Sequence, residues 1–153
     1  MKENNEPMHI LMADDDEDDR RSFAKAWKNA RATNPIHFVN DGEELIDYLH
    51  HRGKFADLPD WARPGLILLD LNMPKKDGRE ALREIKADPN LRQIPVVVLT
   101  TSKAEEDVYR TYDLGANSFI TKPVTFTSMV ELVQILGKYW IEIVETPPNP
   151  IGD

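Results

Sequence analysis

The feature that most constrains this chain is the alternation of short apolar runs with longer segments of helical period. Five runs have the length and composition of strands: His9–Ala13, Ile36–Val39, Leu66–Leu69, Val96–Leu99 and Ser118–Thr121. The third and fourth are apolar at every position, which is typical of strands covered by helices on both sides. The pattern predicts an α/β fold in which helices wrap one five-stranded parallel sheet.

Between these runs, apolar residues recur at the spacing of a helix face. The clearest sets are Phe23, Trp27 and Ala30, then Leu45, Ile46 and Leu49, then Ala81, Leu82 and Ile85. A chain of 153 residues has room for one domain of ordinary size. We expect a flexible N-terminus over 1–7, the domain over 8–144, and a frayed tail over 145–153, which contains three prolines and a glycine.

The negative charge of the chain is concentrated in one place. The net charge of -8 comes from 19 basic and 27 acidic residues, and six of the acids are consecutive, from Asp14 to Asp19. There is no compensating stripe of Lys or Arg, so the sequence gives no sign of direct nucleic-acid binding.

The chain has no cysteine, which excludes disulfides, thiol catalysis and thiolate metal sites. No apolar run approaches the roughly 20 residues that a membrane-spanning helix needs, and none resembles a signal peptide. We therefore expect a soluble cytoplasmic protein without a membrane partner.

Polar residues follow the predicted strands at the edge where parallel sheets bind ligands. Asp14 and Asp15 follow the first strand, Asp70 the third, Thr100 the fourth and Lys122 the fifth. Carboxylates packed together raise one another's pKa unless a cation holds them. Oxygen ligands without nearby His or Cys favour a hard ion, and we expect Mg²⁺.

A carboxylate beside Mg²⁺, a lysine and a threonine hydroxyl indicates phosphoryl transfer. Asp70 is the expected nucleophile, and Asn72 can offer its main-chain carbonyl to the metal. We interpret Asp18 and Asp19 as part of a solvated helix start, where the helix dipole favours acids.

The ordered set Ala13-Asp14-Asp15, Leu-Leu-Asp70-Leu-Asn72-Met-Pro74, Leu99-Thr100 and Thr121-Lys122-Pro123 resembles the receiver domain of two-component response regulators. The resemblance covers about residues 8 to 140. It implies the CheY-like, flavodoxin-like doubly wound sheet with strand order 2-1-3-4-5.

The resemblance also implies a role for each matching residue. Asp70 is the phosphoacceptor, Asp15 a direct Mg²⁺ ligand, and Asp14 a ligand through water. Thr100 and Lys122 hold phosphoryl oxygens, Asn72 supplies its carbonyl to the metal, and the Lys122–Pro123 bond is cis.

The phosphoryl donor implied by the family is a phosphohistidine on a sensor histidine kinase or a phosphotransfer protein. The chain's own histidines follow none of the five predicted strands, so we interpret them as surface or strand filler: His9, His37, His50 and His51. The family also implies a switch protein with slow self-hydrolysis and not a turnover enzyme.

Receiver domains couple phosphorylation to packing through the threonine and an aromatic residue on the fifth strand. Thr100 and Phe119 occupy these positions. If Thr100 turns toward a phosphoryl group, Phe119 gains space to swing inward. Phe119 lacks the hydroxyl of the Tyr common at this position, and a simple core role for its ring stays open.

The last predicted helix carries two apolar stripes. At 100° per residue, we expect one to face the sheet: Phe126, Met129, Val130, Val133 and Trp140. The other lies to one side: Leu132, Ile135, Tyr139 and Ile143. This second stripe predicts a homodimer or partner surface formed by the fourth helix, fifth strand and fifth helix, or a place where the tail folds back.

The long connection from His50 to Gly65 and the Tyr139-Trp140 helix end look like the stand-alone receivers that partner bacterial phytochrome kinases. A bacteriophytochrome is therefore one candidate kinase. The connection itself is either a recognition element or a surface excursion anchored by Trp61.

Two other functions stay open at this point. One is a Mg²⁺-dependent phosphohydrolase with an aspartyl nucleophile, although Asn72 stands close to where such enzymes need a second carboxylate. The other is a protein-binding module of the same fold that works without phosphorylation.

Overall fold

The computed structural model describes residues 7–101 and 105–139. Its strands are β1 (Ile10–Ala13), β2 (Ile36–Val39), β3 (Leu66–Leu69), β4 (Val96–Thr100) and β5 (Ser118–Thr121). Its α-helices are α1 (Glu17–Asn29), α2 (Gly42–Leu49), α3 (Gly78–Ala87), α4 (Glu105–Asp113) and α5 (Phe126–Leu136). All five predicted strands are present, and the boundaries of only β1 and β4 differ, each by one residue.

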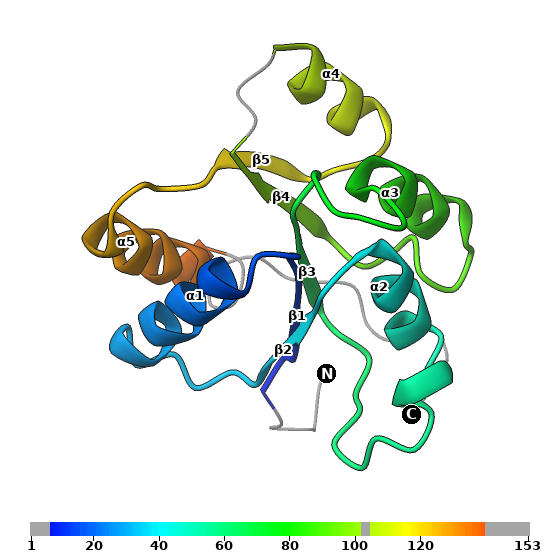
Figure 1. Ribbon diagram of the computed structural model, residues 1–153, viewed down its shortest axis with the longest axis horizontal. Coiled ribbons are helices and arrows are strands. Elements are labelled where there is room, and N and C mark those ends of the chain that lie inside the picture. The colour runs from blue at the N-terminus through cyan, green and yellow to red at the C-terminus, as the bar shows by residue number, and fades with distance from the viewer. Residues whose placement is uncertain (1–6, 102–104, 140–153) are drawn as a thin grey trace.

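The strands form one parallel sheet with the order β2-β1-β3-β4-β5, which confirms the predicted topology. Figure 1 shows α1 and α5 together on one side of this sheet and α2 and α3 on the other, with α4 beside β5. The order reverses between β1 and β3, because the chain adds β2 on one side of β1 and β3 on the other.

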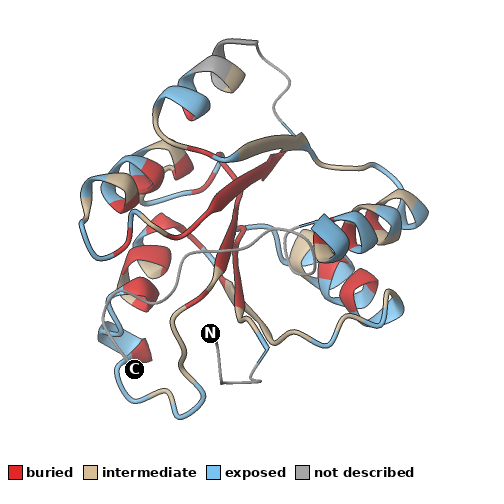
Figure 2. Ribbon diagram, turned by 180° about the vertical axis from the view of Figure 1, so that it is seen from behind, coloured by how far each residue is buried: buried red, intermediate tan, exposed pale blue. Residues whose placement is uncertain are grey.

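Side chains that alternate along each strand fill two separate cores. Leu11 and Ala13 of β1 point into the core under α2 and α3, whereas Ile10 and Met12 point into the core under α1 and α5. The strands at the centre of the sheet are buried on both faces (Figure 2). Burial of the sheet's centre leaves only its edges free to bind ligands.

Three helices that border the ligand-binding edge begin at an aspartate that caps them. Asp16, Asp41 and Asp77 accept hydrogen bonds from main-chain N–H groups in the first turns of α1, α2 and α3. Each cap satisfies donors that a helix N-terminus otherwise leaves unpaired. The caps fix the loops through which the site residues pass.

The connection from 50 to 65 folds against the domain. It includes a short 3₁₀ helix, η1 (Gly53–Phe55). The Trp61 indole N–H donates to the Tyr48 carbonyl at 2.8 Å, and its ring stacks on His51 with 4.1 Å between centroids. Trp61 packs against the core under α2 and α3, so the expected anchoring by this residue is confirmed.

The apolar stripes of α5 are only partly as predicted. Met129 and Val133 face the core as expected, but Phe126, the first residue of the helix, is 45% exposed. Leu136 takes its place as a buried residue. Val130, also predicted to face the sheet, is partly buried against the core under α1 and α5.

The second stripe is likewise divided. Ile135 and Tyr139 are exposed as predicted, whereas Leu132 is partly buried against the core under α1 and α5. Trp140, Ile143 and the predicted tail over 145–153 lie outside the described residues, as does most of the predicted flexible N-terminus.

The expected cis bond between Lys122 and Pro123 is wrong, because every peptide bond in the described residues is trans. The trans form is the favoured state of an X-Pro bond by about 0.5–1 kcal/mol.

Candidate functional site

The predicted site residues meet at the carboxyl edge of the sheet. The Asp70 N–H donates to the Ala13 carbonyl at 3.0 Å, and the Asp14 N–H donates to the Val39 carbonyl at 3.1 Å. The first bond keeps Asp70 beside the end of β1, and the second keeps Asp14 beside the end of β2. Thr100 is the last residue of β4 and pairs with Thr121, so Lys122 follows at the same edge.

Lys122 is the centre of the site. Its ammonium nitrogen Nζ donates to Asp14 Oδ2 at 2.6 Å, to Asp19 Oδ2 at 2.8 Å and to Asp70 Oδ2 at 3.2 Å. The Lys122 side chain is 6% exposed, and those of Asp14 and Asp70 are 0% and 7% exposed. Three carboxylates thus share one buried ammonium group. The low polarity of their surroundings strengthens the attraction between these charges.

The pKa shifts follow from this arrangement. Burial raises the pKa of Asp14, and its hydrogen bond from Lys122 offsets only part of that effect. Burial alone would lower the pKa of Lys122, but its hydrogen bonds to Asp14 and Asp19 outweigh burial and raise it. Lys122 therefore carries its positive charge, and negative charge remains in excess around it.

The loop after β1 is held in shape by its own polar groups. Asp14 Oδ1 accepts from the Asp16 N–H at 2.9 Å, and the Arg20 guanidinium donates to the Asp14 carbonyl at 2.8 Å. Asp16 in turn caps α1. Both oxygens of the Asp14 carboxylate are thereby oriented.

The loop after β3 approaches Asp70 closely. A Cβ atom on Gly78 would lie 2.3 Å from the Asp70 carbonyl oxygen, so only glycine fits there without a shift of the backbone. The Gly78 N–H donates to the Leu71 carbonyl at 2.9 Å. The Asn72 N–H reaches Asp70 Oδ1 at a longer 3.4 Å.

Asp14, Asp15 and Asp70 can together hold a metal ion. One carboxylate oxygen from each lies within 4.8 Å of the others, and no other such group of His, Asp or Glu occurs in the part of the chain that the structure describes. Asp15 is exposed, whereas the other two are buried. Oxygen-only ligands of this kind fit a hard divalent cation. The carboxylate cluster is therefore a candidate divalent metal site.

The two candidate switch residues lie on neighbouring strands. Thr100 is fully buried at the end of β4. Phe119 of β5 pairs with Val98 and is partly buried against the core under α2 and α3. This position is compatible both with a switch role for the Phe119 ring and with a simple role in the core.

Asp19 is the residue that the sequence interpretation missed. It was expected in a solvated helix start, but it binds the Lys122 ammonium while its side chain stays 39% exposed. Its neighbour Asp18 does match that expectation, because its side chain is 91% exposed. No spacing in the sequence indicated this pairing, because Asp15 lies before α1 begins and the contact depends on how the long Lys122 side chain reaches α1.

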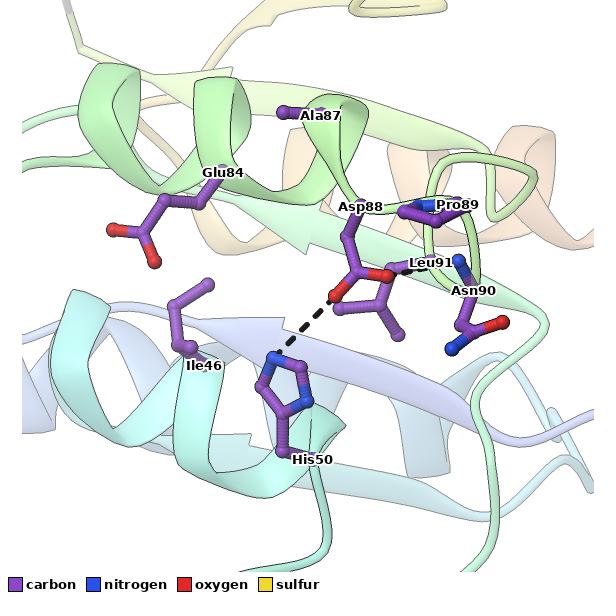
Figure 3. Close-up of a pocket in the computed structure, with 8 residues that line it drawn as sticks. All are labelled: Ile46, His50, Glu84, Ala87, Asp88, Pro89, Asn90 and Leu91. Atoms are coloured by element: carbon purple, nitrogen blue, oxygen red, sulfur yellow. Dashed lines mark hydrogen bonds and ion pairs between the residues drawn. The ribbon is translucent and has the colours of Figure 1, made fainter.

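A separate hollow lies between the C-terminal ends of α2 and α3 (Figure 3). Helices run back across a parallel sheet, so this hollow is at the edge opposite the carboxylates. His50 and Asp88 face each other across it with 3.6 Å between Nε2 and Oδ2. None of the predicted site residues lines this hollow.

No helix among the described residues is both long enough and apolar enough to cross a membrane.

Comparison with known proteins agrees with this geometry. Residues 10–134 match the family model for the response regulator receiver domain. The chain is 41% identical over 145 residues to the response regulator Rcp1 of Synechocystis sp., covering 95% of this chain and 97% of Rcp1.

Two solved structures have the same fold at similar identity. The Mn²⁺-bound form of Rcp1 is 40% identical with a TM-score of 0.82, covering 93% of this chain and 100% of the other. The phosphorylated cyanobacterial phytochrome response regulator RcpA is 40% identical with a TM-score of 0.84, covering 93% of this chain and 99% of the other. With its fold, its carboxylate site and these relatives in agreement, the chain belongs to the family of response regulator receiver domains.

Proposed function

We propose that Asp70 accepts a phosphoryl group from a histidine kinase and that the modified site switches a protein-binding surface. Membership of the family supports the first part of this proposal. Receiver domains of response regulators act in two-component signalling and take phosphate from histidine kinases. One observation carries the assignment to Asp70. Its carboxylate oxygens accept only long hydrogen bonds, at 3.2 Å from Lys122 and 3.4 Å from Asn72, whereas both oxygens of the buried Asp14 carboxylate are held at 2.6 and 2.9 Å.

The transfer follows from the charges at the site. An Asp70 carboxylate oxygen attacks phosphorus, and a new P–O bond forms as the P–N bond of the phosphohistidine breaks. The electron pair of the P–N bond returns to the imidazole, which takes a proton from water. Lys122 and the Thr100 hydroxyl would then hold phosphoryl oxygens, whose negative charge needs donors at this point.

The metal in this proposal is Mg²⁺, bound by Asp14, Asp15, Asp70 and the Asn72 carbonyl. The Mn²⁺-bound form of Rcp1 supports a divalent ion in such a site, and oxygen-only ligands support a hard one. When bound, Mg²⁺ supplies positive charge against the crowded carboxylates and the phosphoryl oxygens.

The proposed output is a change in packing near β5. Thr100 turns toward the phosphoryl group, and Phe119 moves into the space it leaves. Large apolar side chains of α4, of α5 and of the chain beside them are exposed: Tyr112, Val124, Phe126, Ile135 and Tyr139. Such exposure supports a homodimer or partner surface formed by α4, β5 and α5.

The proposed donor kinase is of the phytochrome class. Support comes from the likeness to RcpA, a cyanobacterial phytochrome response regulator. We propose a switch and not a turnover enzyme, because Asn72 stands where a hydrolase would need an acid/base carboxylate close to Asp70.

The experiment that tests the assignment is labelling with phosphoramidate or acetyl phosphate in the presence of Mg²⁺. The wild type should take up one acid-stable, alkali-labile phosphoryl group, and Asp70→Asn should take up none. Asp57→Asn, which changes an exposed aspartate in the 50–65 connection, is the matched control and should label normally. Sustained labelling of Asp70→Asn would refute the proposal, and turnover of a phosphate ester by the wild type would favour the hydrolase.

A further inference from the structure

We propose that Asp19 is a positioning residue that holds Lys122 and competes with the phosphoryl group for its ammonium. The proposal rests on the proposed function and adds to it a residue of α1 that sets the affinity of the site for a phosphoryl group. Asp19 and Lys122 are 103 positions apart in the chain, and their side chains meet at 2.8 Å.

The first step is the number of donors on Lys122. An ammonium group has three N–H bonds, and its nitrogen has three carboxylate partners in this structure. A phosphoryl group on Asp70 can receive an N–H from Lys122 only if one of these three partners gives it up.

The second step is the difference between the three partners. Asp14 and Asp70 also belong to the metal-binding group, but Asp19 does not. Asp14 and Asp70 would share their negative charge between a bound divalent cation and Lys122, whereas Asp19 would have Lys122 as its cationic partner. Asp19 is thus the acceptor with which a phosphoryl oxygen must compete.

The third step is how firmly Asp19 is held. It lies in the first turn of α1, where its N–H bonds to Asp16 Oδ1 at 3.2 Å. The Asp19 side chain is 39% exposed, so water can replace Lys122 as its partner. The competition is therefore reversible, with a strength between that of a surface ion pair and that of a buried one.

The test compares Asp19→Asn with Asp18→Asn. Both changes remove one negative charge from the first turn of α1, but Asp18 is 91% exposed and its ion pair is with Arg21 at 3.6 Å. Any loss of favourable interaction with the helix dipole is therefore common to both variants. Only Asp19→Asn removes an anionic partner of Lys122.

The main measurement is the affinity for beryllofluoride, an acyl-phosphate mimic, in the presence of Mg²⁺. We expect Asp19→Asn to bind beryllofluoride about threefold to fivefold more tightly than the wild type, as loss of a partly exposed ion pair allows. Asp18→Asn should bind it as the wild type does. Equal affinity in the wild type and Asp19→Asn, or an equal gain in both variants, would overturn the proposal.

A second measurement needs neither metal nor phosphoryl group. In ¹⁵N NMR spectra of the metal-free protein, the Lys122 ammonium signal should be shifted and slow to exchange in the wild type and in Asp18→Asn. Asp19→Asn should move the signal and speed its exchange. An unchanged signal would show that Asp19 does not hold Lys122, whatever the affinities are.

The two measurements separate this proposal from the assignment of Asp70. If the wild type bound no beryllofluoride, the proposed function would fail, whereas the NMR signal would still report the Asp19–Lys122 pair. If the wild type bound beryllofluoride and the Asp19 change had no effect, only the role of Asp19 would be lost.

Discussion

The main-chain N–H of Lys122 donates to the carbonyl oxygen of Thr100 at 2.8 Å. The bond extends the β4–β5 ladder one residue beyond the Thr100–Thr121 pair. The two residues proposed to hold phosphoryl oxygens are therefore joined through the backbone, and a movement of one strand end is passed to the other.

Replacing Lys122 with methionine should destabilise the metal-free protein. The change leaves Asp14, which is 0% exposed, and the nearly buried Asp70 without their cation. Leaving a buried charge unpaired costs about 3–5 kcal/mol, and we expect a loss of that size in the free energy of unfolding. Urea denaturation with and without Mg²⁺ measures it, and Mg²⁺ should restore part of the loss.

The matched control is Lys75→Met. Lys75 is 62% exposed and lies 3.8 Å from Asp41, so its removal should change stability by no more than about 1 kcal/mol. Equal losses in the two lysine variants would contradict the view that Lys122 holds the site together.

The fold and the convergence of the site could be predicted because both follow from local patterns. Alternating apolar runs fix the strands, and the parallel arrangement places Asp14, Asp70 and Lys122 at one edge wherever the helices pack. These three residues meet as predicted.

The features that were missed depend on how side chains pack in three dimensions. The pairing of Asp19 with Lys122 depends on the path of a long side chain, which no spacing in the sequence records. The buried position of Leu136 could have been found, since Met129, Val133 and Leu136 repeat at i, i+4 and i+7. The exposure of Phe126 depends on where α5 begins relative to the sheet, which periodicity leaves undetermined.

Asp15→Asn should separate metal binding from folding. Asp15 is the exposed member of the candidate metal site, so its neutralisation should leave the stability without metal within about 0.5 kcal/mol of the wild type. In the wild type, Mg²⁺ at 100 times its dissociation constant should add about 2.7 kcal/mol, and Asp15→Asn should lose most of this gain. Thermal unfolding over a Mg²⁺ titration measures both quantities.

Glu17→Gln is the control for charge in the same acidic run. Glu17 is 72% exposed and pairs with Arg21. Mg²⁺ should stabilise the Glu17→Gln variant as much as it stabilises the wild type. A weakened response in this variant would mean that the general negative charge, and not the three-carboxylate group, attracts the ion.

Gly78→Ala should disturb Asp70 through its backbone. The added methyl group would lie 2.3 Å from the Asp70 carbonyl oxygen and 2.7 Å from the Leu71 Cα, so the loop has to move. We expect a loss of about 1–3 kcal/mol in the free energy of unfolding, and slower labelling by acetyl phosphate.

Gly137→Ala is the matched control, because a Cβ atom there has nothing within 4 Å and the backbone is already helical. This change should leave labelling unaltered and stabilise the protein by about 0.4–1 kcal/mol, through the smaller conformational freedom of the unfolded chain. Normal labelling of Gly78→Ala would show that the close approach at residue 78 does not position Asp70.

Adjacent residues of α5 should separate folding from association. Leu136 is 3% exposed and Ile135 is 63% exposed. Leu136→Ala should cost about 2–5 kcal/mol of stability, because it opens a cavity in the core under α1 and α5. Ile135→Glu should leave the stability of the monomer within about 0.5 kcal/mol.

Ile135→Glu should affect dimer formation even though it leaves the stability of the monomer almost unchanged. If the exposed part of α5 forms the proposed surface, Ile135→Glu places a charge in an apolar contact and should abolish a dimer that the wild type forms, with or without beryllofluoride. Analytical ultracentrifugation gives the oligomeric state, and urea denaturation shows that the variant is folded. A wild type that stays monomeric in both conditions would exclude the homodimer and leave a different protein as the partner of this face.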